Sequence, residues 1–355
     1  MKRVFVVLLF GLILLYAHEG YDTYLSAYHS KERITGILSD IATEVTAIPL
    51  QPADGKTIEK ARDIKKEGND LFLISDDMLY RYNKDGRFIC RITDSEEMKV
   101  AGYLINPGNE ELIVLGNTND VFYYNYNGDL IEKKKLENEL PDRRILSVSL
   151  HNNRIFSVEE NCYLNPDTQE VLVEKELVTY DTSFQRTGSR KLAFVDFGRA
   201  RYITSFSQPQ LCVNPDTGAL YVYNPPKTDD FLLQDTLRLT FSWNQYAGTA
   251  YERQTIPVLP VRPAGRFRIS SSSRFDDDEM NFTFCYDTQT HAYRNIGKGF
   301  TDDYYNTGLI SDLKAMDIEN QTFCFTQSGE AVKEIFPDHT HSGSTVVFIV
   351  KMKEA

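Results

Sequence analysis

The sequence repeats a pattern of short strands joined by a tight turn. Residues 71–92 read LFLISDDMLYRYNKDGRFICRI, and residues 112–136 read LIVLGNTNDVFYYNYNGDLIEKKKL. Each has an apolar strand, a polar break, an aromatic-rich strand and a turn that ends in Gly. Asp-Gly and Asn-Gly supply the positive φ that a tight hairpin requires. Four further segments repeat the pattern with other turns: 154–177, 210–223, 282–296 and 321–335. A chain of repeated hairpins is expected to fold as an all-β protein.

The spacing of these units predicts the kind of all-β fold. One marker position from each turn falls at 86, 128, 168, 218, 289 and 329, so successive markers are 42, 40, 50, 71 and 40 residues apart. Units of about 40–50 residues with four short strands have the size of one propeller blade. We therefore predict a six-bladed β-propeller over residues 45–355. The 71-residue interval holds five prolines and is interpreted as a blade with a long connection. The alternative is a seventh blade hidden between positions 218 and 289.

The composition agrees with a globular all-β chain. The 355 residues are 41% hydrophobic and 25% charged, enough for a sizeable core, and 12% are aromatic, which favours strands. Extended disorder, collagen-like and coiled-coil architectures are excluded. The formal net charge of −12 repels nucleic acid phosphates and anionic membrane surfaces, so we expect neither as a partner.

The amino terminus resembles an export signal. Lys2 and Arg3 precede an unbroken apolar run from Val4 to Ala17. Fourteen helical residues span about 21 Å, short of the roughly 30 Å hydrocarbon core of a membrane. We predict a signal peptide over residues 1–17, with an uncleaved anchor as the alternative. No later stretch is long and apolar enough to span a membrane, so the predicted location is periplasmic or at the cell surface.

The segment after the signal leads into the first strand of the ring. Residues 18–44 are predicted to be a spacer, in which Tyr21–Ile41 has apolar residues at helical spacing and suits either one helix or a flexible segment. The strand predicted at 45–50 and the strand predicted at 345–353 lie at opposite ends of the chain. A closed ring needs its last blade completed by both ends, since an open edge leaves backbone groups unpaired. We therefore expect these two strands to share a blade.

Five cysteines occur in this predicted exported chain: Cys90, Cys162, Cys212, Cys285 and Cys324. Four of them come just before a turn signal, which favours one repeated position in a hairpin. The odd count and the absence of CxxC spacing weaken the disulfide and zinc interpretations. We predict that they are small buried hydrophobic residues.

Residues 48–92 begin IPLQPADGK and end GRFICRI. This segment resembles the opening of an NHL-like six-bladed β-propeller family, whose members occur among exported proteins of gut-type Gram-negative bacteria. Residues 227–243 and 342–353 are similar to a middle unit and to the closing strand of that family. The resemblance covers residues 45–353 and implies the propeller fold. Two features differ: no lipobox cysteine follows the apolar run, and Thr93–Glu97 replaces a glycine-rich loop. The family is largely uncharacterised, so the resemblance implies no specific activity.

One polar segment is a candidate for ligand binding: Asp302, Asp303, Tyr304 and Tyr305. Carboxylates beside tyrosines suit a glycan or peptide, because rings stack on sugar faces and carboxylates bind hydroxyls. Adjacent residues on a strand point to opposite sides, so the two acids are not expected to flank one glycosidic bond. The alternative is an exposed loop between blades.

Three arginines are further binding candidates: Arg274, Arg199 and Arg201. If they end innermost strands, they face the central channel of a propeller, where a buried guanidinium suits carboxylates and phosphates. The alternative is a strand-end arginine exposed to water.

Two segments have partial metal-ligand patterns. His339 and His341 have the H-x-H spacing, but a zinc site requires more ligands. The acidic run Asp276–Glu279 lacks the alternating ligands and the glycine of a calcium loop. We therefore predict no metal and no cofactor.

The predicted function is non-catalytic. The sequence contains no G-x-S-x-G, P-loop or H-E-x-x-H motif, and rigid propeller loops make a general binding surface. We expect an exported binding module for an unidentified small molecule, glycan, peptide or envelope protein. One alternative is a hydrolase or lyase with its site in the central channel, with or without a metal ion. Another is a structural component of an envelope complex.

Overall fold

The computed structural model describes residues 35–94, 98–116, 120–135, 143–151, 154–164, 171–196, 210–213, 220–223, 262–273, 281–290, 292–296, 299–310, 313–317, 320–337 and 345–354. In this part of the chain the regular structure is β-strand, apart from the one-turn helices α2 (Leu38–Ile41) and α3 (Glu330–Lys333) and the 3-10 turn η1 (Pro107–Asn109). No helix among the described residues is long and apolar enough to cross a membrane. The prediction of an all-β fold is confirmed.

Five four-stranded antiparallel sheets form most of the described structure. The first two sheets contain β3 (Arg62–Glu67), β4 (Asp70–Ser75), β5 (Met78–Asn83) and β6 (Phe88–Arg91), then β7 (Val100–Asn106), β8 (Glu111–Gly116), β9 (Asp120–Asn125) and β10 (Leu130–Lys135). The next contains β11 (Arg143–His151), β12 (Arg154–Leu164), β13 (Val171–Tyr180) and β14 (Arg186–Asp196).

Two further four-stranded sheets complete the five. The fourth sheet contains β17 (Arg262–Ala264), β18 (Phe267–Ser273), β19 (Asn281–Asp287) and β20 (Ala292–Asn295). The fifth, here called the closing sheet, contains β23 (Lys314–Asp317), β24 (Thr322–Gln327), β25 (Val346–Met352) and β2 (Ala42–Pro49). A separate pair contains β15 (Gln210–Val213) and β16 (Leu220–Tyr223).

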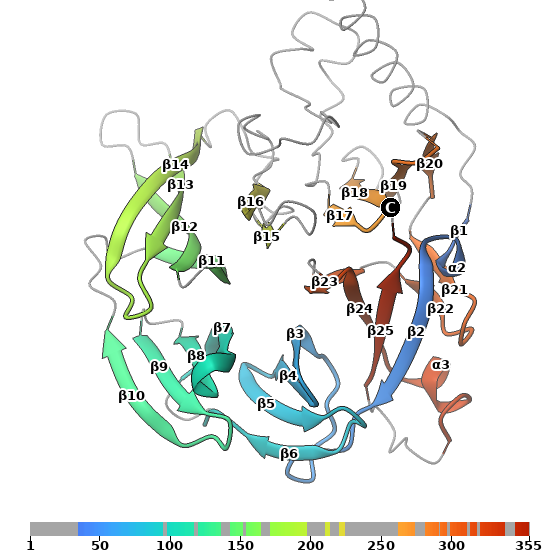
Figure 1. The fold of residues 1–355 in the computed structure, drawn as a ribbon, viewed down its shortest axis with the longest axis horizontal. Helices are drawn as coiled ribbons and strands as arrows, with labels where there is room; N and C mark the ends of the chain where they lie inside the picture. The colour runs from blue at the N-terminus through green and yellow to red at the C-terminus, as the bar shows by residue number, and fades with distance from the viewer. Residues whose placement is uncertain are drawn as a thin grey trace, which may run out of the picture.

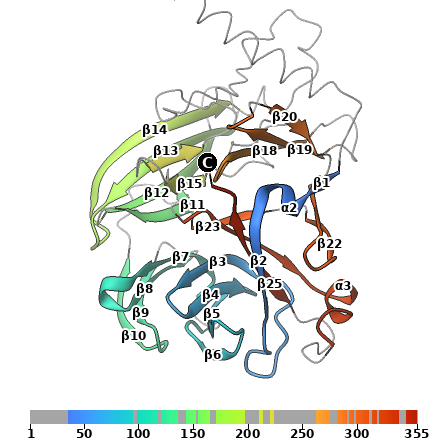
Figure 2. The same ribbon diagram turned by 45° about the vertical axis from the view of Figure 1, so that its right-hand side comes forward.

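The sheets are arranged around a centre, as the blades of a propeller are. Figure 1 shows β3, β7, β11, β17 and β23 toward the middle and β6, β10, β14, β20 and β2 toward the outside. The β3–β6 sheet lies between the β7–β10 sheet and the closing sheet in both views (Figure 1 and Figure 2). The described structure is therefore consistent with a β-propeller.

The closing sheet joins the two ends of the described chain. β2 pairs antiparallel with β25, with Val45 opposite Val350 and Ile48 opposite Val347. β2 is the outermost strand of this sheet, and the other three strands come from the carboxy-terminal part of the chain. The prediction that the two terminal strands share a blade is confirmed.

The hydrophobic core lies between neighbouring sheets. Strand β4 shows how the sequence produces it, because Leu71, Phe72, Leu73 and Ile74 are all buried. Successive side chains of a strand point to opposite faces, so a continuous apolar run fits a strand that is covered on both faces. Leu71 and Leu73 pack with residues of the closing sheet, and Phe72 and Ile74 pack with the β7–β10 sheet.

The same turn joins the third and fourth strands in three sheets. The side-chain oxygens of Asn83, Asn125 and Asp181 each accept the backbone N–H groups two and four residues further on, all at 2.9 Å. Asn and Asp favour such turns because their short side chains replace a backbone acceptor. The residue three positions further on has a positive φ in all three: Gly86, Gly128 and Phe184.

Phe184 shows how packing can replace glycine in this turn. Its φ of 62° is unfavourable for an aromatic residue. Its ring is buried and lies 5.5 Å from the ring of Tyr180, centroid to centroid. Burial of the ring offsets the cost of the backbone conformation.

This repeat corrects two of the turn markers taken from the sequence. Positions 86, 128 and 289 lie between third and fourth strands, whereas 168 lies between the second and third strands and 329 follows a second strand. The equivalent turn of the β11–β14 sheet is 181–185, which has no glycine signal. The markers at 168 and 329 were therefore one strand out of register with the others.

The interpretation of the cysteines as one repeated position is wrong. Of the four cysteines that precede a turn signal, Cys162 and Cys324 lie on second strands but Cys285 lies on a third strand. Cys285 and Cys324 are buried and Cys90 is half-buried, and none of the three is in a disulfide. Their burial, and not a shared place in the repeat, agrees with the sequence analysis.

Residues 36–45, here called the strap, lead from the first described residues into the ring. β1 (Gly36–Ile37) pairs in parallel with β21 (Phe300–Asp302), which pairs with β22 (Gly308–Ile310). The helix expected within residues 21–41 has one described turn, α2, and the predicted signal peptide at 1–17 lies outside the described residues.

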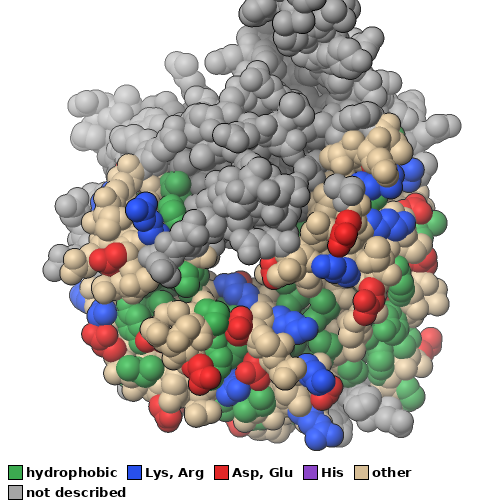
Figure 3. Space-filling model, in the orientation of Figure 1, with side chains coloured by type: hydrophobic (Ala, Val, Ile, Leu, Met, Phe, Trp, Pro, Cys, Tyr) green, Lys and Arg blue, Asp and Glu red, His purple; other side chains and the backbone are tan. Residues whose placement is uncertain are grey.

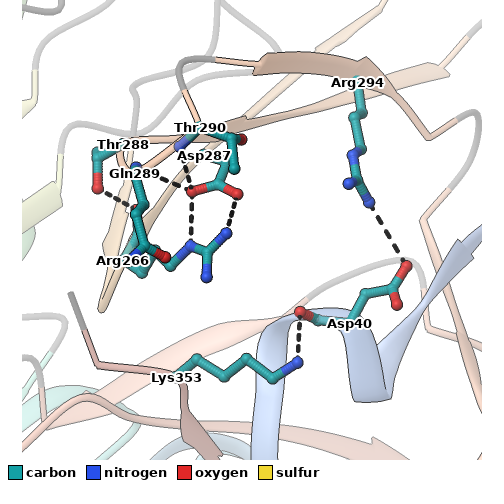
Figure 4. A network of polar contacts seen from close by, with 8 residues as sticks. All are labelled: Asp40, Arg266, Asp287, Thr288, Gln289, Thr290, Arg294 and Lys353. Carbon is teal, nitrogen blue, oxygen red and sulfur yellow. Dashed lines mark hydrogen bonds and ion pairs between the residues drawn. The ribbon is translucent and has the colours of Figure 1, made fainter.

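A polar network connects the strap, the β17–β20 sheet and the carboxy-terminal end (Figure 4). Asp40 lies 3.6 Å from Arg294, and Lys353 donates a hydrogen bond of 3.0 Å to the carbonyl oxygen of Asp40. Arg266 binds Asp287 through two nitrogens, one of them at 2.6 Å. The backbone N–H of Arg266 donates to the carbonyl oxygen of Lys353 at 2.9 Å.

We expect Asp287 to make the fold sensitive to acid. The hydrogen-bonded guanidinium of Arg266 holds the pKa of Asp287 well below its usual range. A depressed folded-state pKa stabilises the fold above the unfolded value of about 4 and loses that stabilisation as the pH falls further. In urea unfolding, Asp287→Asn should lower the midpoint at pH 7, and the difference from the unmodified protein should shrink at pH 3. An equal difference at both pH values would contradict this account.

Candidate functional site

The innermost strands of four sheets each contain an extra residue. In β3, Arg62 lies opposite Ile74 but Lys65 lies opposite Phe72, so three steps along β3 match two along β4. β7, β11 and β23 have an irregularity of the same kind. Such bulges are frequent at sheet edges and beside binding sites, because they bend a strand and turn its side chains. The edges that face the centre of the ring are therefore irregular.

The bulge of β3 is held in place by a buried tyrosine. Asp63 has a φ of 46°, a left-handed conformation that Asp tolerates better than most residues. The hydroxyl of Tyr103 lies 2.7 Å from the carbonyl oxygen of Asp63 and 2.9 Å from that of Phe72, so its single proton is shared between two acceptors. Burial raises the pKa of Tyr103 well above its ordinary value, which keeps the hydroxyl protonated.

Lys65 fixes the other side of this bulge. Its ammonium group donates to the carbonyl oxygen of Tyr103, lies 4.2 Å from the centre of the Tyr103 ring and 3.4 Å from the carboxylate of Asp63. A cation over an aromatic face contributes about 0.5–2 kcal/mol. These contacts hold together β3 and β7, the innermost strands of two neighbouring sheets.

The bulge places two apolar side chains on one side of β3. In a regular strand Ala61 and Ile64, three residues apart, would point to opposite faces. The extra residue between Arg62 and Lys65 shifts the alternation by one, and both side chains join the core against the closing sheet. Both also line a cavity at this place.

The cavity has a volume of about 180 Å³. Its walls come from the start of β3, from Leu309 and Ile310 of β22, from Lys314 of β23 and from residues 324–327 of β24. Figure 3 shows one face of the molecule with an opening at the centre of the ring and side chains of both charges around it. By its lining residues, the cavity lies between the first sheet and the closing sheet, where four segments meet.

The lining contains apolar and polar side chains, and most of its accessible surface is polar. Ile64 and Ile310 are buried, Cys324 is 2% exposed, and Leu309 is 46% exposed. Gln327 donates a hydrogen bond of 3.3 Å from Nε2 to the carbonyl oxygen of Leu309. Lys314 is the only charged side chain among the described residues that line the cavity. The arrangement suits a small ligand that offers polar groups to this lining.

Asp302, one of the predicted binding residues, is completely buried in the turn between β21 and β22. Its carboxylate accepts the backbone N–H groups of Tyr304 and Tyr305, both at 3.1 Å. It also accepts the backbone N–H and the hydroxyl of Thr307, at 3.2 and 2.5 Å. Both oxygens of Asp302 therefore serve the turn itself.

The other three residues of that segment contact the strap. Asp303 accepts the backbone N–H of Ser39 at 3.0 Å. The hydroxyls of Tyr304 and Tyr305 donate to the carbonyl oxygens of Ala42 and Val45, at 3.1 and 3.3 Å. The structure thus brings these predicted residues together beside β2, and a ligand role for them stays a prediction.

The remaining candidates cannot be placed. Arg199, Arg201 and Arg274 lie outside the described residues, as do the acidic run 276–279 and the two histidines at 339 and 341. Among the residues that the structure does describe, no group of three or more His, Cys, Asp or Glu side chains is arranged to hold a metal ion.

The sequence analysis missed the residues of the cavity. They come from four segments, at 61–64, 309–310, 314 and 324–327, and only the fold brings them together. One signal was available. Ala61 and Ile64 are the only apolar residues between positions 59 and 67, and their separation of three does not fit the period of two in a regular strand. That mismatch indicates a bulge.

Comparisons with known proteins leave the family open. No protein-family model matches the chain, and no curated protein matches it. The chain is similar to a solved structure described as a nidogen/laminin complex, with 9% identity over 70% of this chain and 92% of the other and a TM-score of 0.38. It is also similar to a protein of unknown function from Bacteroides caccae, with 12% identity over 67% of this chain and 81% of the other and a TM-score of 0.38. The NHL-like family stays a prediction.

Proposed function

We propose that this protein is an exported, non-catalytic β-propeller that binds a ligand at the cavity between the first sheet and the closing sheet. The observation that carries the proposal is the cavity, whose wall depends on a bulge that buried Tyr103 and Lys65 hold in place. Ligand sites are typically concave and supplied with a few placed polar groups. A rigid strand framework keeps such a site formed in the absence of its ligand.

Further features support the finer points of the proposal. Five four-stranded sheets and the β15–β16 pair support a ring of six blades. The apolar run that follows Lys2 and Arg3 supports export by a signal peptide. The negative charge of the chain disfavours nucleic acid and anionic membranes, which leaves a small molecule, a glycan, a peptide or an envelope protein as the partner.

The proposal can be tested with one pair of matched variants. Leu309 at the cavity is 46% exposed, and Leu130 on the outer strand β10 is 52% exposed. The full chain and the variants Leu309→Asp and Leu130→Asp would be applied to immobilised glycan and peptide arrays, with thermal unfolding recorded for each. We expect the signal to fall at least about tenfold in Leu309→Asp, which replaces an exposed apolar side chain of the cavity with a charge, and to persist in Leu130→Asp.

Two results would contradict the proposal. Equal binding by both variants would place the binding surface elsewhere on the molecule. Absence of any signal from the folded, unmodified chain on both arrays would count against a glycan- or peptide-binding function.

A further inference from the structure

The closing sheet has an innermost strand that is shorter than its neighbour. β23, toward the middle of the ring (Figure 1), has four residues, and its pairing covers residues 322–324 of the six-residue strand β24. In the first two sheets the innermost strand covers residues 70–74 of β4 and 111–116 of β8, nearly the whole of each strand. Among the described strands, none pairs with residues 325–327 of β24 on the side away from β25. We call this side the free edge of β24.

The ladder between β24 and β25 shows which backbone groups point to the free edge. The N–H of Met352 donates to the carbonyl oxygen of Gln321 at 3.1 Å, and the register continues without a shift to Gln327. In an antiparallel ladder, residues that bond to the partner strand alternate with residues that point away from it. Phe325 and Gln327 therefore bond to β25, whereas the N–H and C=O groups of Thr326 point to the free edge.

The cavity lies at this free edge. Residues 324–327 of β24 form one part of its lining and Leu309 of β22 another, and the side chain of Gln327 joins the two by its hydrogen bond to Leu309. Among the described residues, no group binds the backbone N–H or C=O of Thr326. Thr326 therefore offers an unpaired donor and an unpaired acceptor in a cavity whose accessible surface is mostly polar.

The dimensions of this space limit what fits beside β24. The three uncovered residues span about 10 Å, at roughly 3.3 Å per residue of strand. The cavity volume is about 180 Å³, and an apolar protein cavity of about 150 Å³ accommodates benzene, which has six non-hydrogen atoms. Since the backbone of one residue has about four non-hydrogen atoms, the volume holds the backbone of roughly two residues with small side chains.

From these observations, and on the basis of the proposed function, we propose that the cavity binds an extended peptide segment of another chain, which lies along the free edge of β24 and pairs its backbone with Thr326. An unpaired strand edge is a template for a further strand, and in strand addition the main-chain hydrogen bonds provide the affinity. A peptide backbone supplies both the acceptor and the donor that Thr326 lacks, whereas a carboxylate supplies acceptors alone and an ammonium donors alone. The peptide residues inside the cavity are expected to be glycine, alanine or serine.

Amide hydrogen exchange in the full chain measures this pairing directly. The probe is a pentapeptide of alternating alanine and serine with an acetylated amino end and an amidated carboxyl end. Its dissociation constant is expected to be on the order of 0.1–1 mM, because few hydrogen bonds hold it. The unpaired amide hydrogen of Thr326 should exchange fast in the free protein and at least about tenfold more slowly when about 10 mM peptide is present.

Ala47 on the outer strand β2 is the matched control. The N–H of Leu50 donates to the carbonyl oxygen of Thr345 at 3.1 Å in the register of the β2–β25 ladder, so the N–H of Ala47 points away from β25. Pro49, two residues further on, has the same orientation and shows that this edge accepts a residue without an N–H group. The exchange rate at Ala47 should not change when the peptide is added.

A pair of proline variants tests the role of the backbone donor. Thr326→Pro removes the N–H group at the free edge and leaves the bonds between β24 and β25 in place, whereas Ala47→Pro makes the same change at the outer edge. Binding of the fluorescently labelled pentapeptide, followed by anisotropy, should weaken at least about tenfold in Thr326→Pro and stay unchanged in Ala47→Pro. Thermal unfolding of both variants shows whether each remains folded.

A variant of the peptide tests the same point without any change in the protein. Methylation of every backbone nitrogen keeps the side chains and carbonyl groups of the pentapeptide and removes its N–H donors. The methylated peptide should bind the unmodified chain at least about tenfold more weakly, because the carbonyl oxygen of Thr326 then has no donor to pair with. This comparison decides the question even if Thr326→Pro does not fold.

Equal binding of the two peptides, or unchanged exchange at Thr326 in the presence of the peptide, would overturn the inference. Exchange at Thr326 that slows with the concentration of the protein alone would also overturn it, because a second copy of the chain would then occupy the free edge. These outcomes are separable from failure of the proposed function. If exchange at Thr326 does not respond to the peptide but array binding still falls in Leu309→Asp, the cavity binds a ligand of another chemistry and only strand addition is excluded.

Discussion

Replacement of Asp302 by alanine is expected to lower the free energy of unfolding by about 3 kcal/mol. The carboxylate is fully buried and accepts four hydrogen bonds within the turn between β21 and β22. Without it, three backbone N–H groups and a hydroxyl lose their acceptor. The measurement is urea unfolding at pH 7, followed by circular dichroism.

The loss should extend beyond the turn. The turn carries Tyr304 and Tyr305, whose hydroxyls bind the carbonyl oxygens of Ala42 and Val45 in the strap. We therefore expect Asp302→Ala to increase amide hydrogen exchange at the start of β2 as well. Exchange that rises only within residues 302–307 would contradict the link between the turn and the closing strand.

Asp303→Ala is the matched control. Asp303 is the neighbouring carboxylate, is exposed, and accepts a hydrogen bond from the backbone N–H of Ser39. Its replacement should cost less than about 1 kcal/mol, because water can satisfy the freed N–H group. Equal losses from the two variants would show that the buried network of Asp302 does not have the role assigned to it.

The fold was predictable to the extent that it depends on local patterns. Asn83–Gly86 and Asn125–Gly128 are turn sequences, and each supplies both the Asx acceptor and the positive φ. The turn of the β11–β14 sheet was missed because Phe184 adopts the left-handed conformation and tertiary packing, not glycine, stabilises it. The closure of the ring was predictable because any ring needs it.

The candidate site was less predictable, for a physical reason. Asp302–Tyr305 has the composition of a binding segment, yet its polar atoms bind the chain's own turn and strap. The cavity depends on a bulge in β3 and on strands that lie some 250 residues further along the chain. No local pattern records which side chains from distant strands meet. The one sequence signal for the cavity was the spacing of three between Ala61 and Ile64, which does not fit the period of two in a regular strand.

Gly86→Ala is the second variant from which we expect a large loss of stability, about 3 kcal/mol or more. Gly86 has a φ of 80°, which costs an alanine about 1 kcal/mol. An added Cβ would also lie 2.0 Å from the carbonyl oxygen of Pro49 at the end of β2. The atom in the way belongs to the backbone of β2, which cannot move aside as a flexible side chain can. The turn after β5 would therefore have to move away from β2.

Gly68→Ala separates the two causes. Gly68 has a φ of 56°, and an added Cβ would meet nothing within 4 Å. This variant should therefore show the backbone cost alone, about 1 kcal/mol, in the same urea experiment. The backbone N–H of Gln51 donates a hydrogen bond of 2.9 Å to the carbonyl oxygen of Gly86. The amide hydrogen of Gln51 should therefore exchange with solvent faster in Gly86→Ala and at an unchanged rate in Gly68→Ala. If the two variants lose equal stability, contact between the first hairpin turn and the closing strand does not help to hold the ring shut.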